Sequence, residues 1–144
     1  MTMMINRAIA AIALLAAAGC GSSSPPAPTT TSNAPYSQQD LVVGTGATAN
    51  AGNNVTVSYT LWLYDSSKTN GKGNQVQTNP GFVFVLGAGR VIAGWDRGVP
   101  GMRVGGQRRL IVPPELAYGN NSPDPSTIPQ NATLVFDIAL LGVQ

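Results

Sequence analysis

The chain has 144 residues, of which 43% are hydrophobic and only 10% are charged, and its formal net charge is +2. This length predicts a single folded domain. The positive charge is weak and scattered, with Arg108 and Arg109 as the one adjacent basic pair, so a nucleic-acid-binding surface is not expected. With no histidine and a single cysteine, the chain lacks imidazole-based catalysis, an intrachain disulfide and a cysteine-based metal site. We therefore expect neither a metal nor a cofactor.

Residues 1–20 have the pattern of a signal peptide. Arg7 supplies a positive charge, and residues 8–18 are continuously apolar but too short to span a membrane, which takes about 20 residues. The small residues before Cys20 resemble the lipobox of bacterial lipoproteins, with Ala17 at a position where that motif usually has leucine. This resemblance implies that Cys20 carries acyl chains and becomes the mature N-terminus. The alternative is an ordinary cleaved signal that leaves a free cysteine behind.

The next segment, residues 21–39, is uncharged and rich in proline, serine and threonine. This composition predicts an extended, solvated tether. A folded domain is then expected over residues 40–144. Together these features predict an exported, monomeric protein that is anchored by lipid to a bacterial membrane. Its domain would face the periplasm or the cell exterior.

Within this domain, apolar and polar residues alternate over residues 55–64, 82–86 and 108–112, which predicts three strands. Residues 132–143 are apolar on both faces, which predicts a strand that is covered on both sides. The covering element is expected in residues 91–102, where apolar residues recur at helical spacing. We predict the α+β class, mostly β, with an antiparallel sheet wrapped around one short helix.

Two segments of the domain are predicted to be loops. Residues 65–80 are polar and contain glycines, which indicates an insertion rather than a strand. Residues 120–130 contain three prolines, which indicates a stiff surface loop.

Aromatic residues are the most informative feature left, because no pair of catalytic carboxylates, phosphate-binding loop or nucleophile–base pair is present. They lie on several predicted elements that can converge: Tyr59, Phe82, Trp95, Tyr118 and Phe136. Taken alone, they are more typical of the core of a small β protein than of a binding pocket.

The order of several longer sequence motifs decides whether these aromatic residues form a pocket or only a core. The strings are VSYT at 57–60, FVFVLG at 82–87, VIAGWDRGV at 91–99, MRVGG at 102–106, LIVPPELAYG at 110–119, IP at 128–129 and NATLVFD at 131–137. Together they resemble the FKBP-type peptidyl-prolyl cis-trans isomerases over about residues 40–144. The resemblance implies the FKBP fold, isomerase (rotamase) activity on proline-containing polypeptide clients such as exported proteins, and binding of macrolide inhibitors.

The resemblance also implies a pocket. Trp95 would form its floor, and Tyr59, Phe82 and Phe136 its aromatic walls.

The same resemblance assigns aliphatic lining to Val91, Ile92 and Ile128. The backbone N–H of Ile92 and the hydroxyl of Tyr118 would donate hydrogen bonds to a substrate carbonyl.

Two adjacent positions depart from the family pattern. Where the family commonly has Phe-Asp, this chain has Val76 and Gln77, expected at the rim of the pocket. Such a change bears on turnover and on macrolide affinity. The alternative function is therefore a non-catalytic module, or a chaperone on the same fold, that binds proline-containing segments without fast turnover. A purely structural lipoprotein would leave the order of the aromatic residues unexplained.

Overall fold

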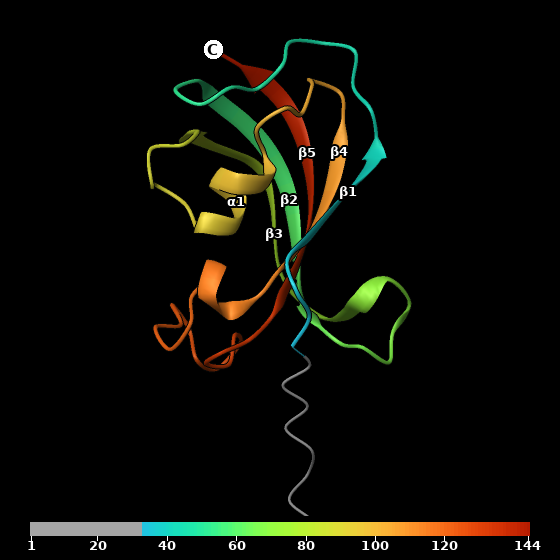
Figure 1. Cartoon of the computed structure of the whole chain (residues 1–144), viewed down its shortest axis with the longest axis vertical. Helices are drawn as coiled ribbons and strands as arrows, with labels where there is room; N and C mark the ends of the chain where they lie inside the picture. Colours follow the sequence, from blue (N-terminus) through green and yellow to red (C-terminus); the bar gives the residue numbers. More distant parts are fainter. Residues whose placement is uncertain (1–32) are drawn as a thin grey trace, which may run out of the picture.

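A computed structural model of the chain describes residues 33–144 (Figure 1). The predicted signal peptide, the predicted lipidation site Cys20 and most of the predicted tether lie outside the described residues. Within residues 33–144, no helix has both the length and the apolar character needed to cross a membrane.

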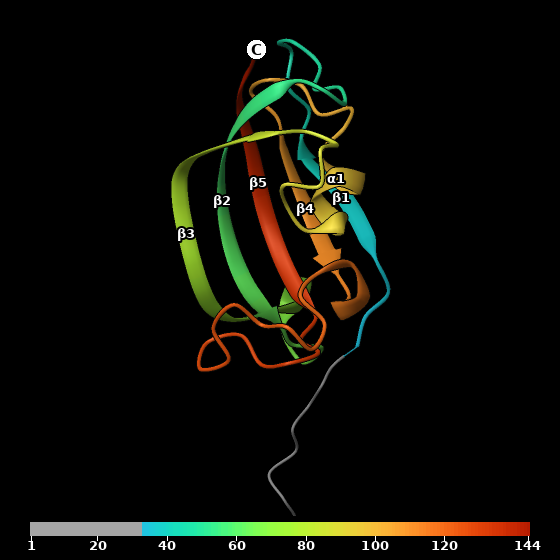
Figure 2. The ribbon, with the colours of Figure 1, turned by 90° about the vertical axis from the view of Figure 1, so that its left-hand side faces the viewer.

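Five strands form one antiparallel sheet in the spatial order β1-β4-β5-β2-β3. The strands are β1 (Ser37–Val42), β2 (Asn54–Tyr64), β3 (Lys72–Val85), β4 (Gln107–Val112) and β5 (Leu134–Val143). Residues 33–144 also contain one α-helix, α1 (Ala93–Gly98), and two short 3₁₀ turns, η1 (Thr69–Gly71) and η2 (Pro114–Leu116). The helix lies on one face of the sheet (Figures 1 and 2) and packs against β4. The predicted fold class, a mostly β antiparallel sheet wrapped on one short helix, is confirmed.

The core lies between this helix and the sheet. Strand alternation turns the apolar residues of the three inner strands toward α1, and the most deeply buried of these are Val55, Val57, Leu110, Val112, Leu134, Ile138 and Leu140. From the helix side, Trp95 and Val99 are buried against them. A Cβ on Gly94 would collide with Val112, so the small residues of α1 allow the helix to approach β4 closely.

The prediction of a loop over residues 65–80 is wrong for its second half, because β3 begins at Lys72. This strand lies at the edge of the sheet and pairs only with β2. An edge strand with one solvated face has little need of apolar residues, and Gln75, Gln77 and Thr78 are all exposed. The pairing with β2 also contains register shifts, which interrupt the period of two.

The face of β5 that points away from α1 is shielded only in part. The prediction of a strand covered on both sides is therefore also partly wrong. Val135 is fully buried, whereas Leu141 is 50% exposed. The central position of β5, between β4 and β2, accounts for this, because side chains of both neighbouring strands flank it.

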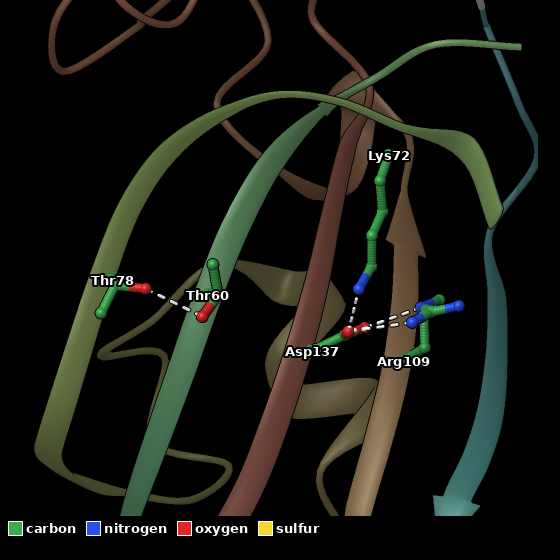
Figure 3. A network of polar contacts seen from close by, with 5 residues as sticks. All are labelled: Thr60, Lys72, Thr78, Arg109 and Asp137. Atoms are coloured by element: carbon green, nitrogen blue, oxygen red, sulfur yellow. Dashed lines mark hydrogen bonds and ion pairs between the residues drawn. The ribbon is translucent and has the colours of Figure 1, made fainter. Parts of the chain in front are cut away.

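A polar network occupies this face in place of a second layer (Figure 3). The Asp137 carboxylate accepts two hydrogen bonds from Arg109 at 2.7 and 2.9 Å and one from Lys72 Nζ at 2.5 Å. Lys72 Nζ also lies 3.9 Å from the centre of the Trp62 ring. Burial of Asp137 acts to raise its pKa, but the hydrogen bonds from Arg109 and Lys72 outweigh burial and hold this pKa below its usual value.

The ordered sheet begins earlier than the predicted domain boundary at residue 40. Residues 37–39, expected in the tether, belong to β1 and pair with β4. Before them, Tyr36 packs against the core and its ring lies 4.6 Å from the Arg97 guanidinium. All six residues of β1 are exposed, so this edge strand has no apolar periodicity by which the sequence could reveal it.

Candidate functional site

A cavity of about 220 Å³ opens on the face of the sheet that carries α1. Its walls come from β2, β3, β5, the start of α1 and the connection between β4 and β5. The lining residues are Tyr59, Leu61, Gln77, Phe82, Arg90, Val91, Ile92, Trp95, Tyr118 and Phe136.

The structure brings together most of the residues that the sequence assigned to the pocket. Two of them do not line the cavity. Ile128 is only 5% exposed and belongs to the hydrophobic core, and Val76 is half-buried and packs against that core. Of the two residues predicted at the rim, only Gln77 lines the cavity.

Two lining residues, Leu61 and Arg90, were missed. Leu61 follows Tyr59 by two positions on β2, so strand alternation places both on the same face, and this signal was available in the sequence. Arg90 precedes the helix in a glycine-containing turn, where neither periodicity nor the aromatic pattern marks it.

Trp95 forms the floor of the cavity. The indole is 4% exposed and contacts Tyr59, Phe82 and Phe136 edge to face, with ring centroids 4.9, 6.0 and 5.3 Å away. Each edge-to-face pair is worth about 0.5–1.5 kcal/mol beyond the area it buries. The aromatic walls therefore hold one another in place before any ligand arrives.

The rim beside the helix is fixed by Asp96. Its two carboxylate oxygens accept hydrogen bonds from the backbone N–H groups of Gly87 and Gly89, at 2.9 and 3.1 Å. Both glycines have positive φ angles, 76° and 68°, which favour glycine over residues with a side chain. The helix thus holds the turn that leads into Val91 and Ile92.

Ile92 stands immediately before the first residue of α1. The early backbone N–H groups of a helix have no carbonyl partner within the helix. Within residues 33–144, the N–H of Ile92 makes no backbone or side-chain hydrogen bond. Because Ile92 also lines the cavity, its N–H is a donor available to a ligand, as the resemblance implied.

Polar groups on the opposite side complete the cavity. Gln77 Nε2 donates a hydrogen bond to the Tyr59 hydroxyl at 3.0 Å. Burial raises the pKa of Tyr59, opposed by a hydrogen bond from Asn79, and burial also raises the pKa of Tyr118, with a further contribution from Tyr59. Both hydroxyls therefore keep their protons at neutral pH and remain hydrogen-bond donors.

This arrangement suits the binding of an apolar ring and of amide carbonyls. None of the lining residues carries a carboxylate, thiol or imidazole. Nor does any group of three potential metal ligands occur within the described part of the chain. The cavity can desolvate and orient a peptide. A reaction catalysed there has to proceed without a carboxylate, thiolate or imidazole as the base.

Comparisons with known proteins agree with this geometry. The family described as FKBP-type peptidyl-prolyl cis-trans isomerase matches residues 46–141. "FK506-binding protein 4" of Dictyostelium discoideum is 46% identical over 104 residues, which cover 72% of this chain and 27% of that protein. "FK506-binding protein 1B" of Neurospora crassa is 42% identical over 106 residues, which cover 72% of this chain and 93% of the relative. The chain spans about a quarter of the length of the first of these relatives.

Solved structures give the same match. The "Crystal structure of AtFKBP13" superposes with a TM-score of 0.63 at 33% sequence identity, covering 76% of this chain and 93% of that one. FkpA from Escherichia coli gives a TM-score of 0.61 at 33% identity, covering 76% of this chain and 48% of that one.

Proposed function

Because this chain belongs to the FKBP-type peptidyl-prolyl cis-trans isomerase family, we propose that its aromatic cavity catalyses rotation about X–Pro bonds in polypeptide clients. The observation that carries this proposal is the cavity itself, with the Trp95 indole as its floor and the free N–H of Ile92 at its edge. A proline ring fits an apolar floor, and the neighbouring carbonyl requires a donor.

The reaction needs no acid, base or nucleophile. Rotation about an X–Pro bond faces a barrier near 20 kcal/mol, because the amide loses its resonance at the twisted midpoint. A twisted amide has less charge separation than a planar one, so a dry aromatic cavity disfavours the planar ground state more than the twisted state. The walls formed by Tyr59, Phe82 and Phe136 supply such an environment.

Hydrogen-bond donors orient the bound chain. The Ile92 N–H and the Tyr118 hydroxyl lie at the edges of the cavity, where they can donate to carbonyl groups that flank the proline. Holding these carbonyls fixes the turn that twisting requires. Gln77, through its bond to the Tyr59 hydroxyl, positions one aromatic wall.

The experiment that tests this function is an isomerisation assay on a short X–Pro peptide, with Tyr118→Phe as the cavity variant. Loss of the hydroxyl donor is expected to lower kcat/KM about fivefold, because a neutral hydrogen bond contributes about 1 kcal/mol. Tyr64→Phe is the matched control, since Tyr64 lies on β2 but does not line the cavity. An enzyme that accelerates no X–Pro bond would contradict the proposal.

A second candidate function is a binding module that holds proline-containing segments without fast turnover. The observation that favours it is Gln77, a neutral amide at the cavity where the resemblance implies an acidic residue. Binding of a proline peptide or of the macrolide FK506, with no acceleration in the same assay, would support this alternative.

We further propose that the protein works outside the cytoplasm, anchored to a bacterial membrane through acylated Cys20. The support is the sequence of residues 1–20 and the proline-rich tether that follows. Newly exported chains would be the clients, since their uncatalysed prolyl isomerisation takes tens of seconds. Intact-mass analysis of membrane-extracted protein is expected to show a lipid-modified N-terminal cysteine. A soluble mature chain that begins elsewhere would contradict the anchor.

A further inference from the structure

Arg90 is the only charged residue among those that line the cavity. Its side chain is exposed, and it directly precedes Val91 and Ile92, which form the rim beside the helix. Within residues 33–144 the ion pairs connect Lys72 and Arg109 with Asp137, and Arg108 with Asp40. None of them neutralises Arg90.

The acid closest to Arg90 in sequence is also committed elsewhere. Both carboxylate oxygens of Asp96 accept backbone hydrogen bonds from Gly87 and Gly89, and Asp96 forms no ion pair with Arg90. The same bonds fix the turn from which Arg90 projects. Within residues 33–144 the Arg90 guanidinium therefore has no ion-pair partner, and it belongs to a residue of the cavity lining that stands on a fixed turn.

The opposite wall does not compensate for this charge. Gln77 is neutral, and apart from Arg90 the remaining polar side-chain atoms of the lining residues are tyrosine hydroxyls and an indole N–H. Among the described residues that line the cavity, Arg90 thus carries the one formal charge, and this charge attracts an anion and repels a cation brought close to it.

From these observations we propose that Arg90 is a specificity-determining residue that favours clients with an acidic side chain next to the proline. This inference rests on the proposed isomerase function, because it concerns the occupant of the same cavity. The guanidinium matches a carboxylate geometrically and can pair with it through two hydrogen bonds.

The size of the preference follows from the exposure of Arg90. An exposed pair of opposite charges raises affinity by about threefold, which is the effect expected for a Glu peptide beside Arg90. Two like charges lower it by about the same factor, which is the effect expected for a Lys peptide. The two effects together predict kcat/KM about tenfold higher for a Glu peptide than for a Lys peptide at low ionic strength. Because salt screens exposed charges, the ratio is expected to shrink toward one in about 0.5 M salt.

The test uses the full chain and peptides that differ only at the residue before proline (Glu, Gln or Lys), with a second set in which the charge follows proline. Exchange between cis and trans forms is measured by NMR, which avoids the sequence preference of a coupling protease. The expected order of kcat/KM is Glu, then Gln, then Lys. Equal values for the Glu and Lys peptides in both sets would overturn the proposal.

Two variants assign the effect to Arg90. Arg90→Gln is expected to remove the difference between the Glu and Lys peptides, and Arg90→Glu to reverse it. Arg103→Gln is the matched control, because it removes an exposed positive charge from a residue that does not line the cavity. If Arg103→Gln lowers the ratio of kcat/KM between the Glu and Lys peptides as much as Arg90→Gln does, the preference comes from overall charge. That result would overturn the assignment to Arg90.

The outcome also separates this proposal from the proposed function. Turnover of all peptides without dependence on charge contradicts the role of Arg90 alone. If no peptide is isomerised, the proposed function fails, and titration calorimetry with the same peptides still tests the charge preference through their dissociation constants.

Discussion

Replacing Gln77 by Glu tests how the cavity uses the Tyr59 hydroxyl. In the structure, Gln77 Nε2 donates to this hydroxyl at 3.0 Å. A glutamate has the same length but can only accept, so the direction of the hydrogen bond reverses and the Tyr59 hydroxyl becomes the donor. The substitution therefore changes charge and polarity while keeping the reach of the side chain.

The expected gain follows from the strength of the new bond. A hydrogen bond to an ionised acceptor is roughly twice as strong as a neutral one, which amounts to about 1 kcal/mol here. Gln77 is exposed, so desolvation of the new carboxylate costs little. We expect kcat/KM, or the affinity for FK506, to rise by up to about fivefold. Gln77→Asp is expected to give a smaller rise, because its side chain is one methylene shorter.

A double-mutant cycle with Tyr59→Phe isolates the hydrogen bond. If the bond is responsible, Gln77→Glu has no favourable effect in the Tyr59→Phe background. A gain of equal size in both backgrounds would refute the reasoning, because it would show that the carboxylate acts without Tyr59. A fall in kcat/KM would show instead that the Tyr59 proton is needed by the client.

Three further predictions concern stability. Asp137→Asn is expected to lower the free energy of unfolding by about 1–3 kcal/mol, measured by urea denaturation, while Glu115→Gln on an exposed turn leaves it unchanged. The pKa of Asp137 is depressed in the folded state, so its ion pairs stabilise the protein above about pH 4. This contribution is lost as the pH falls through the folded-state pKa. Below about pH 4, the free energy of unfolding of Asp137→Asn should therefore change less with pH than that of the unchanged protein. Gly94→Ala is expected to cost about 1–3 kcal/mol because its Cβ collides with β4, whereas Gly81→Ala meets no atom within 4 Å and should be tolerated in the same measurement. A fragment lacking residues 1–39 is expected to unfold at lower urea concentration than one lacking residues 1–32, because part of β1 is missing; equal midpoints would contradict a structural role for residues 33–39.

The inner strands could be predicted from sequence because one of their faces is buried. In β2, Val55, Val57 and Leu61 repeat with period two since each packs toward α1. The edge strands lack this constraint. In β1 every residue is exposed, and Phe84 is the only deeply buried residue of β3, so no period marks β1 or the part of β3 before Phe82.

The candidate site was predictable where packing fixes residue type. Trp95 and Phe136 are almost completely buried, and their neighbours allow few alternatives, so they stand within the strings that resemble the family. Arg90 shows the opposite case. Its side chain is exposed, nothing in the core depends on its identity, and only the path of the turn places it at the cavity.

The central position of β5 has a consequence for how the domain folds. This strand follows all the others in sequence, yet it lies between β4 and β2. Its pairing joins Val55 to Val143, and the pairing of β1 with β4 joins Ser37 to Ile111. Long-range pairings of this kind slow folding, because a large loop has to close before any contact forms. A chain that arrives N-terminus first can form the β2–β3 pair and then the β1–β4 pair, and the two pairs join into one sheet only after β5 has arrived.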